Sequence, residues 1–163
     1  MLGGLYTQEL QYEMISINKM LARLPDDKLD WKPHEKSMSL GQLAAHIVEI
    51  PGYINAIIDK NELNFADGYE PLKAESSGQL VVAFKEITDK AIAALNSVSD
   101  LSMYQNWTLR NGDQVIFTIP RVGAIRSMVF SHMIHHRGQL SVYLRLLNVP
   151  VPSIYGPSAD EAV

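Results

Sequence analysis

The stretch "SHMIHHRGQL", residues 131–140, places three of the chain's five histidines within five positions. It lies inside an apolar pattern that steps by three and four residues, which is the spacing of one helix face. His132 and His136 fall on that face. The pattern therefore predicts a helix whose core-facing seam carries imidazoles among apolar residues. That seam reads Ile125, Val129, His132, His136, Gln139 or Leu140, Tyr143 and Leu147.

Three other segments have the same periodicity, at residues 5–23, 39–57 and 78–97, and the histidine-bearing helix is expected over 120–148. Four helices with heptad-like seams predict an all-α four-helix bundle, with residues 1–163 as one domain. The first three seams are Leu10, Met14, Ile17, Leu21 and Leu24; Leu43, His46 or Ile47, Ile50, Ile54 and Ile57; and Leu80, Phe84, Ile87, Ala91, Ala94 and Val98.

Local signals mark where these segments begin and break. Ser39 and Gln42 form an S-x-x-Q capping box, which predicts the start of the second helix. Pro51 removes a backbone donor inside that helix and predicts a kink. The polar connection at 61–79 is long enough to cross from one end of a bundle to the other. Asn111-Gly112, between "WTL" and "VIFTI", predicts a small β-hairpin before the last helix.

Composition excludes several classes of protein and site. A net charge of −4 and no basic stripe argue against a nucleic-acid partner. The absence of cysteine excludes disulfides, thiolate metal ligands and a cysteine nucleophile. The N-terminus does not have the pattern of a signal peptide, and no apolar run reaches membrane-spanning length, so neither export nor a membrane is expected. A cytoplasmic protein is the prediction.

The seam positions of the histidines point to a shared ligand. His132 and His136 are about 40° apart around a helix and about 6 Å apart along it, so both rings can reach one point. His46 lies beside the core seam of the second helix and can supply a third imidazole. Burying several unpaired polar rings costs about 1–3 kcal/mol each, and a divalent metal would satisfy all three. His132 with His135 is a competing pair, and His135 otherwise edges the seam; His34 is expected to face solvent or to make a local hydrogen bond.

The chain resembles the DinB/YfiT-like family of small metal-binding four-helix bundles. The resemblance is carried by "WKPHEKSMSLGQLAAHI" (31–47), "HMIHHRGQLSVYLRLLNVPVP" (132–152) and the closing "SIYGPSADE" (153–161). It implies an up-down-down-up bundle, commonly a homodimer. It also implies a metal held by three histidines, which map here onto His46, His132 and His136.

Three neutral imidazoles would leave a metal ion with its charge and at least one open position, which is typical of a catalytic site. Zinc and nickel both suit imidazole. Glu49 and Gln139 are the candidate catalytic residues, either as acceptors for a ligand's second nitrogen or in acid–base work; packing or solvation is the alternative for each. Tyr53 and Tyr143 could line a pocket or simply pack in the core.

Four more residues have structural expectations. Arg137 is expected to pair with a carboxylate on a neighbouring helix. Gly138 costs about 1 kcal/mol in a helix, which is usually offset by close approach of another backbone, within the bundle or across a dimer. Trp107 is expected to cap the open end of the bundle, and Trp31 to anchor the first connection.

The resemblance implies two alternative functions. The first is a metal-dependent enzyme, most concretely a thiol S-transferase in which the metal activates an external low-molecular-weight thiol, or else water; a hydrolase or isomerase is also compatible. Its partners would be a small-molecule substrate and that thiol. The second is a non-catalytic metal-binding stress-response protein.

Overall fold

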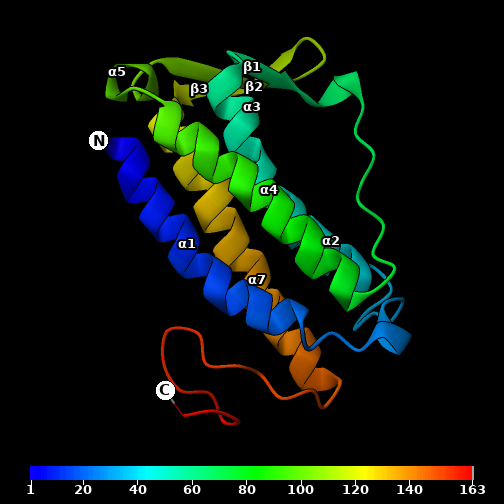
Figure 1. Cartoon of the computed structure of the whole chain (residues 1–163). Helices are drawn as coiled ribbons and strands as arrows, with labels where there is room; N and C mark the ends of the chain where they lie inside the picture. Colours follow the sequence, from blue (N-terminus) through cyan, green and yellow to red (C-terminus); the bar gives the residue numbers. More distant parts are fainter. Residues whose placement is uncertain (163) are drawn as a thin grey trace.

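The chain folds into a mostly helical structure with a small sheet, shown in Figure 1 by a computed structural model that describes residues 1–162. The helices are α1 (Leu2–Leu21), α2 (Leu40–Glu49), α3 (Tyr53–Asp59), α4 (Ser77–Ser97), α5 (Asp100–Met103), α6 (Arg121–Ile125) and α7 (His132–Leu146). The strands are β1 (Glu62–Asn64), β2 (Asn106–Asn111) and β3 (Gln114–Pro120). Short 3₁₀ turns are η1 (Asp26–Lys28), η2 (Ile50–Gly52) and η3 (Phe65–Asp67), and η4 (Arg126–Ser131) is a π-helix.

The long helices enclose the core, and the sheet lies at one end of them (Figure 1). Helix α4 packs against α1 and α2, and α7 packs against the same two helices. Most of the predicted seams are buried, including all five apolar residues predicted from Leu43 to Ile57. The segment between β1 and α4 runs from the sheet end to the opposite end of the helices, as its length predicted (Figure 1). The up-down-down-up four-helix topology stays a prediction.

The second predicted helix begins where the sequence indicated and breaks where proline stands. The Ser39 hydroxyl accepts from the Gln42 amide at 3.2 Å, and the Gln42 side chain accepts from the Ser39 amide at 2.8 Å. This capping box confirms the predicted start. At Pro51, where the sequence predicts a kink, the 3₁₀ turn η2 interrupts the helical run, so α2 and α3 are separate helices.

The fold is mostly helical, as predicted, but the predicted hairpin is part of a larger sheet. Strands β2 and β3 do pair antiparallel, with Gly112 at φ 57° in their turn, but β1 adds a parallel partner on the other side of β2. The result is a three-stranded sheet with the order β1-β2-β3. Strand β1 has only three residues, so it has no room for the alternation that marks a strand in a sequence.

The last helical segment runs from Arg121 to Leu146 as α6, the π-helix η4 and α7. Its buried face on α7 differs from the predicted seam by one position, because the buried residues are Met133, Arg137, Leu140 and Leu144. His132 and His136 are half-buried at the edge of the core rather than inside it. The π-helix explains the difference, since its wider turns alter which residues share a face.

Arg137 is paired with a carboxylate on a neighbouring helix, as predicted. Its guanidinium binds Glu13 of α1 and donates to the Ser16 hydroxyl at 2.7 Å. Only 2% of Arg137 and 4% of Glu13 are exposed. At Gly138, in contrast, no atom from another helix or strand lies within 4 Å of the place where a Cβ would stand, so the expected close approach within the bundle is wrong. An approach across a dimer interface stays a prediction.

The two tryptophans hold the ends of the helical core. Trp107 of β2 is fully buried, with its ring centroid 6.2 Å from that of Phe117 on β3, so the sheet closes one end of the core as predicted. Trp31 lies edge-on to Tyr143 of α7 at 5.7 Å, which anchors the first connection. Tyr143 therefore packs rather than lining the histidine site.

We expect Arg137→Ala to lower the free energy of unfolding by about 3–5 kcal/mol, because it leaves the Glu13 carboxylate buried without its partner. Urea unfolding measures the change. Arg126→Ala is the matched control, since Arg126 pairs with Glu9 of the same helix α1 in a solvent-exposed bridge. The Arg126→Ala substitution should lower the free energy of unfolding by only about 0–1 kcal/mol. Equal losses in the two variants would contradict the role given to the buried pair.

Candidate metal centre

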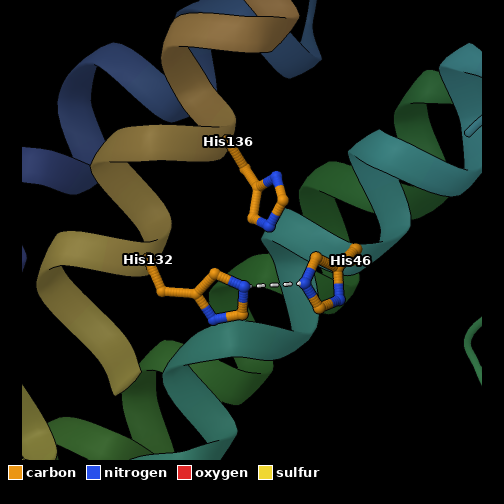
Figure 2. A group of neighbouring side chains, drawn as sticks. All are labelled: His46, His132 and His136. Atoms are coloured by element: carbon orange, nitrogen blue, oxygen red, sulfur yellow. Dashed lines mark hydrogen bonds between the residues drawn. The ribbon is translucent and has the colours of Figure 1, made fainter. Parts of the chain in front are cut away.

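Three histidines from two helices converge on one point beside the core (Figure 2). His46 comes from α2, and His132 and His136 come from successive turns of α7. One nitrogen from each ring lies within 4.8 Å of the others, an arrangement that could hold a metal ion. The ring centroids are separated by 4.9 Å (His46–His132), 4.7 Å (His46–His136) and 4.6 Å (His132–His136).

The spacing of the nitrogens suits a single divalent ion. The Nε2 atoms of His46 and His132 are 3.1 Å apart (Figure 2). Two nitrogens bound to one tetrahedral zinc ion at about 2.0–2.1 Å lie about 3.3 Å apart. A small change in ring orientation would therefore convert the observed contact, which can also be a hydrogen bond between neutral rings, into metal coordination.

The second nitrogens of two rings are held by acceptors, which fixes their tautomers. His132 Nδ1 lies 3.2 Å from the Met128 carbonyl of η4, and His136 Nδ1 lies 2.6 Å from Gln139 Oε1. An oxygen acceptor keeps the proton on Nδ1, so Nε2 carries the free lone pair. Both α7 histidines thus present an unprotonated Nε2 to the centre of the triad.

Burial and mutual proximity keep the triad uncharged. Desolvation lowers the pKa of His46 from its usual value, and the neighbouring His136 lowers it further. The pKa of His132 falls to about 4 for the same reasons, since burial and the two partner rings outweigh its bond to the Met128 carbonyl. Burial also lowers the pKa of His136. Neutral imidazole is the form that binds metals, so at neutral pH the three rings are in the protonation state that metal binding requires.

The two candidate catalytic residues have different surroundings. Gln139 accepts from the second ring nitrogen of His136, which is one of the roles predicted for it. Glu49 instead accepts a hydrogen bond from the Tyr69 hydroxyl and another from the Leu72 amide at 2.7 Å. Within residues 1–162 it makes no hydrogen bond to His46. Glu49 therefore holds the segment that precedes α4 rather than orienting a triad ring.

The remaining histidines lie outside the triad. His135 is exposed on α7, with its ring 4.9 Å from His136, and the competing pair of His132 with His135 is not the cluster that forms. His34 is exposed and accepts a local hydrogen bond from the Lys36 amide, as expected.

Two hollows that share no lining residue border the triad. The His46 hollow, about 270 Å³, is lined by Met38, Gln42, His46, Glu49, Tyr69 and Leu72 together with neighbouring residues. The His132 hollow, about 470 Å³, is lined by Tyr53, Phe65, Phe117, Met128, His132 and His135 together with two serines. Tyr53 therefore lines a hollow, one of its two predicted roles. No sequence pattern predicts the contributions of Phe65, Tyr69 and Phe117, because their segments reach the site only through the tertiary fold.

Arg121 secures the elements around the His132 hollow and was not identified from the sequence. It is 4% exposed, and its guanidinium donates to the Ile57 carbonyl at 2.9 Å and to the Asn61 side chain at 2.8 Å. These bonds tie the start of the last helix to the end of α3 and to the chain entering β1. A lone arginine after a proline has no pattern that reveals such a role.

A family model described as "DinB family" matches residues 2–162, nearly the whole chain. The chain belongs to the DinB family. It is 26% identical over 157 residues to the uncharacterized protein YrdA of Bacillus subtilis (strain 168), covering 96% of this chain and 89% of YrdA. It is 28% identical over 130 residues to the uncharacterized protein YjoA of the same organism, covering 78% and 79%.

Solved DinB-like structures have the same fold. A DinB-like protein from Bacillus cereus ATCC 10987 matches with a TM-score of 0.70 at 23% identity, over 91% of this chain and 94% of that chain. The DinB-like protein YjoA from Bacillus subtilis matches with a TM-score of 0.70 at 22% identity, over 91% and 96%. DinB membership and the clustered histidines support the predicted resemblance. Among the described residues, no helix is long and apolar enough to cross a membrane.

The lowered pKa values predict an acid-sensitive fold in the metal-free protein. Unfolded histidine takes up a proton near pH 6.5, whereas folded His132 does so only near pH 4. Between these values the unfolded state binds more protons, so the free energy of unfolding should fall as the pH falls. Urea unfolding in EDTA at pH 7.5 and 5.5 measures this loss.

His132→Gln should show a smaller loss of unfolding free energy between the two pH values than the wild type, because it removes the imidazole whose pKa burial and the partner rings lower to about 4. His34→Gln is the control, since His34 is exposed and lies outside the triad. A loss that is the same in the wild type and in His132→Gln would rule out the triad as its source.

Proposed function

We propose that His46, His132 and His136 bind one divalent metal ion, zinc or nickel, and that the centre serves a metal-dependent enzyme of the thiol S-transferase type. The observation that carries the proposal is the convergence of three imidazole nitrogens within 4.8 Å, two of them with Nδ1 already bound to an oxygen acceptor. Such acceptors are the usual outer partners of metal-binding histidines.

The donor set favours chemistry over a closed structural site. A divalent ion held by three neutral imidazoles keeps its full charge and can lower the pKa of a water or thiol that binds it. No carboxylate of the described residues joins the cluster, and the triad borders two hollows through which small molecules can approach. Both properties are typical of catalytic rather than structural metal sites.

The chain's own residues would have distinct tasks in such a reaction. Gln139 and the Met128 carbonyl keep the protons of His136 and His132 on Nδ1. Glu49 shapes the His46 hollow through Tyr69 and Leu72. In a thiol transfer the thiol proton passes to solvent, the sulfur forms a bond to an electrophilic carbon, and the leaving group departs with the bonding electron pair. The external thiol supplies the nucleophile, since the chain contains no cysteine.

We propose that the protein is a cytoplasmic homodimer with the up-down-down-up bundle of its family. The mutual packing of α1, α2, α4 and α7 supports that topology. Exposed Gly138, where no atom from another element lies within 4 Å of an added Cβ, leaves room for a second copy near α7. A non-catalytic metal-binding stress-response protein is the alternative function, supported by the same triad.

Metal binding is tested first. Isothermal titration of metal-free protein with zinc and with nickel should give one ion per chain for at least one of them. His132→Ala should abolish this binding, because two imidazoles cannot hold the ion at the same affinity. Gln139→Ala should weaken it about 10–100-fold, since the His136 ring loses its orienting partner.

His135→Ala is the matched control, because it removes the neighbouring imidazole outside the triad. It should bind metal as the wild type does. Equal binding by His132→Ala and the wild type would overturn the assigned ligands.

Activity distinguishes the enzyme from the stress protein. We expect metal-loaded protein to accelerate adduct formation between small thiols and an alkylating electrophile, or hydrolysis of an ester, in a substrate panel. His132→Ala should lose at least about 100-fold of that rate, while His135→Ala retains metal. Stoichiometric metal binding without turnover anywhere in the panel would favour the non-catalytic alternative.

A further inference from the structure

The His132 hollow is built from aromatic and thioether groups that four chain segments bring together. Tyr53 begins α3, Phe65 begins η3, Phe117 lies in β3, and Met128 lies in η4. Its polar groups are the imidazoles of His132 and His135, the Tyr53 hydroxyl and two serine hydroxyls. Among the described residues that line it, none is an aspartate, glutamate, lysine or arginine. The lining therefore favours an uncharged ligand.

The aromatic side chains of this hollow leave apolar surface open to solvent. Phe65 is 44% exposed, and Tyr53 and Phe117 are half-buried. The hollow has a volume of about 470 Å³ and is wide open to solvent, so a small molecule can enter it. A planar, apolar ligand would bury this surface, stack against the rings and contact the Met128 sulfur.

The other hollow at the triad has a different chemical character. The His46 hollow is smaller, at about 270 Å³, and contains the Glu49 carboxylate beside the Tyr69 hydroxyl. An apolar ring would displace water from a carboxylate there without replacing its hydrogen bonds, which is unfavourable. The two hollows therefore suit two different ligands, one beside His46 and one beside His132.

We propose that the His132 hollow binds the uncharged, planar apolar part of the substrate and places it beside the triad. The proposal builds on the proposed function, because His132 belongs both to the triad and to the wall of the hollow. The second reactant then approaches from the His46 hollow. The substrate class is thus a small molecule with an aromatic or similarly flat apolar group.

Methionine methyl groups report on the two hollows separately. Met128 lines the His132 hollow and Met38 lines the His46 hollow. We label the methionine methyls with carbon-13, assign them through Met128→Leu and Met38→Leu, and titrate metal-free protein with 1-naphthol as a neutral aromatic probe. The Met128 signal should shift in a saturable manner, while the Met38 signal stays in place. A shift of Met38 alone, or no saturable shift, would overturn the proposal.

Truncating the aromatic side chains that line the His132 hollow should weaken the binding of 1-naphthol. Phe65→Ala is expected to raise the dissociation constant about tenfold, and the double variant Phe65→Ala with Phe117→Ala should abolish saturation. Ile116→Ala is the matched control, because Ile116 precedes Phe117 on β3, is 47% exposed and points to the opposite face of the strand. It should bind 1-naphthol as the wild type does; an equal weakening by Ile116→Ala would contradict the assigned wall.

The use of metal-free protein separates this proposal from the proposed function. If the triad binds no metal, 1-naphthol should still shift Met128, and only the metal function fails. If metal binds to the triad but 1-naphthol leaves Met128 unchanged, only the aromatic site fails.

Discussion

The buried ion pair between Arg137 and Glu13 fixes the rotation of α7 about its own axis, and the histidine site depends on that rotation. Two charges buried to this degree are tolerated only with good geometry and further hydrogen bonds, which Ser16 and the Tyr155 hydroxyl supply. Arg137 must therefore face α1. Since successive residues are about 100° apart on a helix, His136 is turned away from α1 and toward His46 of α2.

The π-helix η4 aligns the buried face of α6 with the buried face of α7. The buried residues Ile125, Val129, Met133 and Arg137 are spaced by four throughout. On a regular α-helix each such step rotates the face by about 40°, so three steps would turn it by about 120°. Because a π turn holds more residues, η4 takes up part of this rotation. The same segment supplies the Met128 carbonyl that binds His132, so one irregularity serves both the core and the site.

The sequence predicted the features that local spacing encodes. The helices, the capping box at Ser39 and the clustering of His46, His132 and His136 follow from periodicity and from residue types. The sequence did not reveal β1, whose three residues become a strand only by pairing with a segment more than forty positions away. The sequence pattern also predicted that His132 and His136 lie in the core, because a regular helical period does not take the π-helix into account. The sequence could not predict the two hollows either, because their walls come from distant segments that are joined by hydrogen bonds such as those of Arg121.

The C-terminal tail supports the Arg137–Glu13 ion pair that orients α7 and so positions the histidine site. Tyr155 binds Glu13 through its hydroxyl at 2.7 Å and places its ring 4.6 Å from the Arg137 guanidinium, so the tail covers the ion pair. Arg145 of α7 and Arg23 then hold the tail through Asp160 and Glu161. Helix α7 thus uses one face for structure, where Arg137 meets α1 and the tail, and the adjacent face for the triad. Because the two faces share no side chain, the histidines can be altered for metal or substrate without removing the interaction that holds their helix in place.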